Sequence, residues 1–244
     1  MAIATLIAIT VLCIAWSLWI RRVTWTCRWE VAATLNIALQ GAAVVLMSPF
    51  ASETLGHWLH ALTGMWNLED YLGHDCYIVA ASAIVYNALG RLQDDNALHV
   101  TFKQYVERPA TVCIPVLLVA FSLGNGSTIY RADFFTVPTD FWLSAYWLFL
   151  CGMLIYLLGY GFRALLILRR DPRSRMIANI YLVASASGIV ACAVRITTAF
   201  FHPIQALEGG RLVWFFACVC GAVFALAAAH SWRVKTKWFT KADH

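Results

Sequence analysis

Seven apolar segments, separated by short polar connections, constrain the fold of this chain more than any other feature of its sequence. A helix rises about 1.5 Å per residue, so about 20 residues cross the roughly 30 Å of hydrocarbon in a bilayer. The sequence therefore predicts an all-α, polytopic integral membrane protein with seven transmembrane helices in residues 1–232, followed by a basic cytoplasmic tail at 233–244. The predicted spans are residues 2–20, 29–49, 67–89, 109–123, 141–162, 176–200 and 212–232.

The amino-acid composition agrees with a membrane protein and excludes several classes of function. The 244 residues are 61% hydrophobic and 13% charged, with a mean hydropathy of +0.69, which a water-soluble domain of this size does not tolerate. The connections leave no room for a soluble catalytic domain, and the sequence contains no HExxH metalloprotease motif. We therefore expect a protein that is not an enzyme, needs no cofactor or metal ion, and binds no nucleic acid.

The eight cysteines do not form the pattern of a disulfide framework. No two of them share a connection, and we interpret those inside apolar segments as small buried residues. The cysteines inside apolar segments are Cys13, Cys113, Cys151, Cys192, Cys218 and Cys220.

Lysine and arginine are distributed unequally between the two sides of the predicted bundle. Fifteen of the 18 lie in the first, third and fifth connections and in the tail. Arg131 and Arg211 lie in the opposite connections, and Arg195 lies within the sixth segment. Basic residues are retained on the cytoplasmic side of a membrane. We therefore expect an outside N-terminus and a cytoplasmic C-terminus in the plasma membrane, with anionic lipid headgroups at the cytoplasmic face.

Two segments carry further structural predictions. The fourth span, 109–123, is short and contains Pro115, and the connection before it, residues 91–109, either lies along the inner leaflet or extends the third helix. In the seventh span Ala217, Gly221 and Ala225 recur every fourth position, a spacing that lets helix backbones approach closely. Gly221 is therefore expected to pack against another helix.

The third span is unusual because it opens with polar side chains. Asn67 is followed three residues later by Asp70, which resembles a variant of the capping box. Glu69 and Asp70 lie in the first turn, where free backbone N–H groups favour carboxylates. His74 is one turn further along the same stripe, so we expect it to face the bundle and not lipid.

Arg195, in the sixth span, is the second polar residue at this depth. A charged side chain within a bilayer is costly, so Arg195 should either reach outward to water or pair with Asp70, Asp75 or Glu208. If His74 and Arg195 converge, they form a polar pocket in the outer half of the bundle. The sequence thus identifies His74, Asp70, Asp75 and Arg195 as a candidate site for a small anion, a lipid headgroup or a proton.

His57 and His60 lie three residues apart in the longest outer connection. On a helix this spacing puts both imidazoles on one face, as a metal or proton site with His74 would need. The alternative is an amphipathic interfacial turn whose Trp58 lies at headgroup level, and we prefer this interpretation.

The stretch NLEDYLGHDCYIVAASAIVYNAL resembles the third helix of actinobacterial seven-helix integral membrane proteins described as transporters. In that group the helix opens with an Asn-Leu pair and carries a histidine seven residues after the asparagine, which correspond to Asn67, Leu68 and His74. The resemblance covers residues 20–95 and the seven-span layout. Larger members of the group carry a cytoplasmic domain after the last helix, whereas this chain ends twelve residues after Trp232.

Three functions are compatible with these patterns. The first is a bacterial or phage-encoded sensor-like or protein-interaction module with an outer polar pocket, acting through a membrane-protein partner or a homo-oligomer. The second is a transporter of a small solute or of protons, although no acidic residue lies at a midplane. The third is a structural protein that modifies the cell envelope.

Overall fold

The computed structural model describes residues 2–28, 30–201, 203–205 and 210–242, and these residues form helices and connections without a strand. The all-α prediction is therefore confirmed for the described part of the chain. The long helices are α1 (Ala2–Ile20), α2 (Val31–Leu46), α5 (Leu68–Leu89), α7 (Arg108–Leu123), α9 (Phe141–Leu168), α10 (Arg175–Phe200) and α12 (Arg211–Ala242). The shorter elements are η1 (Arg22–Thr26), α3 (Pro49–Ala51), η2 (Ser52–Gly56), α4 (His57–Thr63), α6 (Asp95–Phe102), η3 (Lys103–Glu107), α8 (Asn125–Thr128) and η4 (Phe134–Thr136).

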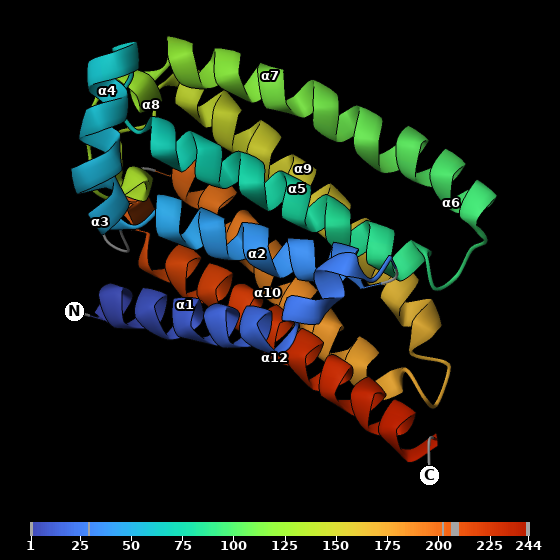
Figure 1. The fold of residues 1–244 in the computed structure, drawn as a ribbon. Coiled ribbons are helices and arrows are strands. Elements are labelled where there is room, and N and C mark those ends of the chain that lie inside the picture. Colours follow the sequence, from blue (N-terminus) through green and yellow to red (C-terminus); the bar gives the residue numbers. More distant parts are fainter. Residues whose placement is uncertain (1, 29, 202, 206–209, 243–244) are drawn as a thin grey trace.

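The long helices lie side by side as an elongated bundle (Figure 1). The N-terminus, α3, α4 and α8 lie at one end, which we call the α4 end, and the C-terminus lies at the other, which we call the C-terminal end. Helix α5 packs between α2 and α9, while α12 packs against α1 and α10. The polar α5 is therefore an interior helix, and the apolar α1 forms part of the outer surface.

Five helical stretches in the described residues are long and apolar enough to cross a membrane, and a sixth is obtained if α2 and the helical segment 49–63 count as one bent span. The two parts of that pair meet at 60°. Helix α5 is not among them, although its 22 residues would reach about 33 Å at 1.5 Å per residue. Its mean hydropathy is lowered by the carboxylates and the histidine of its first two turns.

The connection before the fourth span has a different conformation from either prediction. Residues 95–123 form one continuous helical stretch through α6, η3 and α7, so the connection lengthens the fourth helix and not the third. Leu98 and Val106 are buried, which explains why a segment with many charges continues as a packed helix. Pro115 is accommodated within α7.

The prediction for Gly221 is confirmed. A Cβ atom at this position would lie 3.3 Å from Gln40 Oε1 and 3.6 Å from Thr10 Cγ2, so α12 approaches α1 and α2 closely there. Gly188 is tighter, because an added Cβ would lie 2.8 Å from Leu158 Cδ1. Helix contacts in this bundle therefore depend on small residues.

The capping-box prediction for Asn67 is wrong. Asn67 adopts a left-handed backbone conformation with φ of 55°, and its side chain makes no cap hydrogen bond to α5 or to Asp70. Instead, Asn67 Nδ2 donates to the carbonyl oxygens of Gly126 (2.7 Å) and Ile129 (2.8 Å), and Oδ1 accepts from the backbone N–H of Arg131 (3.4 Å). Asn67 thus fixes α8 and the loop after it against the start of α5.

At the C-terminal end, a fully buried arginine joins three helices. Arg21 donates to the Glu30 carboxylate (2.9 Å), the hydroxyl of Thr34 (3.1 Å) and the carbonyl oxygen of Ala228 (3.0 Å). Lys235 forms a second ion pair with Glu30. The network connects the end of α1, the start of α2 and the second half of α12.

Candidate functional site

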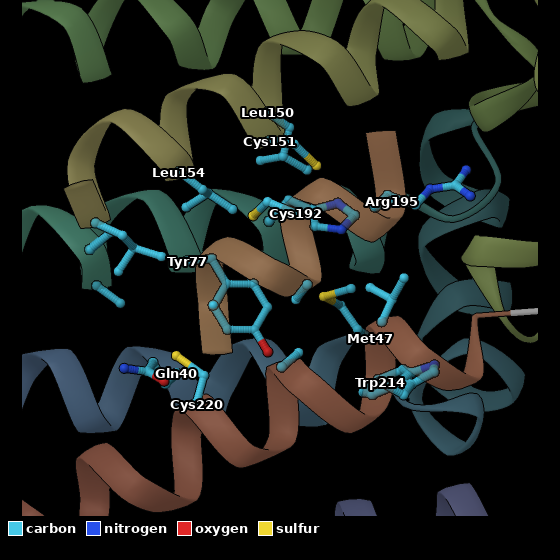
Figure 2. Close-up of a pocket in the computed structure, with 18 of the residues that line it drawn as sticks. Gln40, Met47, Tyr77, Leu150, Cys151, Leu154, Cys192, Arg195, Trp214 and Cys220 are labelled. Carbon is cyan, nitrogen blue, oxygen red and sulfur yellow. The ribbon is translucent and has the colours of Figure 1, made fainter. Parts of the chain in front are cut away.

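A cavity of about 90 Å³ lies inside the bundle between α2, α5, α9, α10 and α12, and we call it the central cavity. Its wall is mainly apolar and aromatic, with a few polar groups (Figure 2). A mostly apolar cavity with a small number of polar groups is typical of a small-ligand site. The polar and aromatic residues of the wall are Gln40, His74, Tyr77, Trp147, Arg195 and Trp214.

Arg195 lies in the part of the cavity nearest the α4 end and is 2% exposed. Its guanidinium carbon lies 4.1 Å from the ring centre of Trp147, and Nη1 donates to Thr198 Oγ1 (3.2 Å) and to the carbonyl oxygen of Phe135 (3.5 Å). Nε and Nη2 are buried and have no hydrogen-bond partner among the described residues. Arg195 is therefore a buried cation whose donors are only partly satisfied.

His74 lies at the same end of the cavity and is also buried. Its Nδ1 forms a hydrogen bond of 2.8 Å with the hydroxyl of Tyr146, and its ring packs edge-on against Trp147 with centroids 5.1 Å apart. Because Trp147 also contacts Arg195, the structure places both predicted polar residues around one indole ring. The hydrogen bond to Tyr146 fixes the orientation of the imidazole.

The two predicted carboxylates do not join this arrangement. Neither Asp70 nor Asp75 lies within salt-bridge distance of Arg195 or lines the central cavity, so the predicted pairing with either residue does not occur. Asp70 is buried with Oδ2 unpaired among the described residues, and Asp75 is half-buried toward Tyr71 on another face of α5. Glu208, the third predicted partner, lies outside the described residues.

The acid with the clearest electrostatic connection to Arg195 is Asp133, in the loop before η4. Asp133 Oδ1 accepts hydrogen bonds from the backbone N–H of Phe135 (3.2 Å) and from the indole of Trp214 (3.4 Å). Burial raises the pKa of Asp133, and these hydrogen bonds and the attraction of Arg195 offset only part of that rise. Asp133 is therefore a weak counter-charge that does not touch the guanidinium.

The half of the cavity away from Arg195 contains groups that sequence reasoning missed. Figure 2 shows the Tyr77 ring projecting into the middle of the cavity, with Gln40 and Cys220 on the side opposite Arg195. Gln40 Nε2 donates to Asn36 Oδ1 (2.7 Å), whereas Gln40 Oε1 has no partner among the described residues. The signals in the sequence were Asn36 and Gln40 four residues apart in an apolar span, and Tyr77 three residues after His74.

The two histidines of the outer connection form a separate cluster. His60 stacks on Trp66 with centroids 3.6 Å apart, and His57 contacts Trp66 and Tyr130 edge-on. His74 makes its ring contacts elsewhere, so the three histidines do not share a site. Helix α4 carries an exposed Trp58, in agreement with the amphipathic interpretation.

No family model, no curated protein and no solved structure matches this chain. The resemblance to the actinobacterial seven-helix group therefore stays a prediction.

Proposed function

We propose that this protein is a ligand-binding membrane module whose central cavity holds a small organic anion, and that occupation of the cavity is passed to the basic face of the bundle. The observation that supports this proposal is the state of Arg195. It is a buried cation without an ion-pair partner among the described residues, and two of its nitrogen atoms lack hydrogen bonds.

The two unpaired nitrogen atoms of Arg195 carry an energetic cost. A buried donor without an acceptor costs about 1–3 kcal/mol, and more when the group is charged. Contact with Trp147 compensates part of the charge but supplies no acceptor atom. An anion at the guanidinium supplies both acceptor oxygens and the missing counter-charge, because carboxylates form strong charge-assisted hydrogen bonds with arginine.

The rest of the cavity determines which organic group the ligand can carry. The side chains that surround Tyr77 are mainly aliphatic, aromatic or thiol groups. A cavity of about 150 Å³ is known to bind benzene, and the central cavity, at about 90 Å³, is smaller. A short-chain carboxylate, with its charged end at Arg195 and its alkyl end toward Tyr77, suits both the volume and the chemistry.

The proposed topology has seven crossings, with the N-terminus outside and the C-terminus in the cytoplasm of a bacterial plasma membrane. Counting α5 as a span is supported by its place between α2 and α9 and by the burial of its polar residues away from lipid. The orientation is supported by the basic connections at the C-terminal end. On this topology, Arg195 and His74 lie in the outer half of the bundle.

Proton or solute transport is the second candidate, and one observation favours it. Glu69 and Asp70 are adjacent and buried, and three of their carboxylate oxygens have no partner among the described residues. Buried acids of this kind are found in proton pathways of membrane proteins. Proton flux into liposomes containing the wild type, and its loss in Glu69→Gln, would favour transport over binding alone.

The binding proposal is tested with the purified full chain in detergent. Propionate should quench or shift the fluorescence of Trp147 and Trp214 and raise the thermal midpoint, whereas propionamide, which is neutral and of similar size, should do neither. Arg195→Gln should abolish the response and Arg195→Lys should retain part of it. Arg131→Gln, a matched change at an exposed arginine of the same end, should respond like the wild type.

The proposal is contradicted if Arg195→Gln still responds to propionate, or if propionamide acts as strongly as propionate. Either result would remove the reason for placing an anion at the guanidinium.

A further inference from the structure

A second hollow, of about 300 Å³, lies at the C-terminal end of the bundle, and we call it the basal pocket. It shares no lining residue with the central cavity. About 30 Å³ of liquid volume belongs to one water molecule, so the basal pocket has room for a polar group of many atoms. Its lining residues are Arg28, Glu30, Ala32, Tyr86, Asn87, Gly90, Arg91, Leu98 and Lys235.

The basal pocket is positively charged. Three residues of the lining are positively charged (Arg28, Arg91 and Lys235) and one, Glu30, is negatively charged, so the lining carries a net charge of +2. The carboxylate of Glu30 is already held by Lys235 and by Arg21, which lies behind it. The one acid of the lining is therefore neutralised within the protein and does not repel an anion from the pocket.

Two donors of the pocket are available to a ligand. The Arg91 side chain forms no ion pair or hydrogen bond with any described residue, and the same holds for the side-chain amide of Asn87, one turn earlier on α5. Arg28 is paired with Asp95 at 2.7 Å, but both side chains are largely exposed. An incoming phosphate can therefore exchange this pair at little cost, because exposed ion pairs contribute about 0–1 kcal/mol.

The pocket lies where a membrane headgroup would be found. It is built from the last turn of α5, the first turn of α2 and the part of α12 near Lys235, all at the end of the bundle that carries the basic connections. Leu98 closes one wall by packing against Gly90, and Tyr86 contacts Phe102 edge-on. Exposed apolar side chains occur at the same end, on η1 (Val23, Trp25) and beside Lys235 (Val234), and can contact acyl chains.

We infer that the basal pocket binds the phosphomonoester headgroup of an anionic membrane lipid, with Arg91 and Asn87 as its primary donors. Basic pockets between helices at the cytoplasmic side of membrane proteins are suited to such headgroups. A lipid is favoured over free phosphate because exposed apolar side chains lie on the chain segments next to Arg28 and Lys235. The inference uses no residue of the central cavity and does not depend on the ligand proposed there.

The test uses the purified full chain and native mass spectrometry of its complexes with added lipid. Phosphatidic acid should bind more tightly than phosphatidylglycerol, whose phosphate is a diester, and phosphatidylcholine should bind least. Arg91→Gln should weaken the binding of phosphatidic acid roughly fivefold, as expected for one basic residue near a headgroup, and Arg91→Lys should keep most of it.

Two further variants keep the test decisive. Asn87→Asp changes no volume but places a negative charge in the pocket, so it should also lower the affinity for phosphatidic acid. Arg170→Gln removes an exposed arginine at the same end that does not line the pocket, and should bind like the wild type. Circular dichroism of each variant shows whether its fold is intact.

The inference is overturned if Arg91→Gln and Asn87→Asp both fold and bind phosphatidic acid as the wild type does, or if Arg170→Gln loses as much affinity as Arg91→Gln. A final arm adds inorganic phosphate or glycerol 3-phosphate as a competitor. Displacement of phosphatidic acid at comparable concentrations of the soluble anion would assign the pocket to free phosphate and refute the lipid.

Discussion

The two fully buried arginines of this bundle differ in how their charge is compensated. Arg21, at the C-terminal end, is held by a carboxylate, a hydroxyl and the backbone carbonyl oxygens of Glu30 and Ala228. Arg195, near the α4 end, has one hydroxyl and one distant carbonyl oxygen and keeps two nitrogen atoms unpaired among the described residues. The difference supports the proposal that Arg21 is part of the scaffold whereas Arg195 binds a ligand.

The largest effect is expected at the counter-ion of Arg21. Glu30→Leu leaves Arg21 buried without its carboxylate, and breaking a buried pair in this way costs about 3–5 kcal/mol. Thermal unfolding in detergent should show a large loss of stability. The matched control is Asp95→Leu, which breaks the exposed pair with Arg28 and should cost less than about 1 kcal/mol. Equal effects of the two variants would show that Arg21 is not a structural centre.

The contact of α12 with α1 and α2 can also be tested with a substitution that changes no charge. Gly221 lies where α12 meets α1 and α2, the three helices that the Arg21 network joins. Gly221→Leu should force these helices apart and destabilise the protein by about 1–3 kcal/mol, as overpacking does. Gly152→Leu is the control, because no atom lies within 4 Å of a Cβ added there. Unchanged unfolding of Gly221→Leu would mean that this contact is loose.

Arg195 should behave in the opposite way to Arg21 when it is replaced. Arg195→Met keeps the volume and removes the unpaired donors, and such replacements of buried charges are often neutral or stabilising. The loss of the contact with Trp147 acts against this gain, so we expect the stability without ligand to change by less than about 1 kcal/mol. A loss as large as that of Glu30→Leu would make Arg195 a scaffold residue and weaken the proposed function.

Part of this contrast could be predicted from the sequence. Hydropathy located the long helices, the four-residue spacing of small side chains located the contact at Gly221, and the shared depth of His74 and Arg195 placed both at one cavity. These features depend on local periodicity and on distance along a helix, which the sequence encodes directly.

The remaining features depend on contacts between residues far apart in the chain. The amide of Asn67 binds a loop about 60 residues later, and Arg21 binds a carbonyl oxygen 207 residues later, so neither partner is visible in a local pattern. The sequence predicts a connection for the charged segment of α6 and η3, because the burial of this segment depends on only a few side chains such as Leu98 and Val106.

The smallest expected effect concerns Asp133, the acid with the clearest electrostatic link to Arg195. Because burial raises its pKa in the folded state above the ordinary value of 3.8, ionisation of Asp133 disfavours the folded protein. Its contribution to stability is therefore greatest below that value and is lost as the pH rises through the folded-state pKa. Asp133→Asn keeps an acceptor for Trp214 and removes the ionisation, so the thermal midpoint of the variant should depend less on pH in this window.

Asp171 provides a comparison for Asp133, because it is an exposed residue whose pKa is shifted in the opposite direction. Hydrogen bonds from Ser174 and from the backbone N–H of Arg173 lower the pKa of Asp171, so its contribution is lost as the pH falls. Asp171→Asn should therefore not change the loss of stability that occurs as the pH rises above 3.8, whereas Asp133→Asn should reduce that loss. If both variants keep the wild-type profile, burial does not raise the pKa of Asp133 enough to affect stability in this window, and the prediction is wrong.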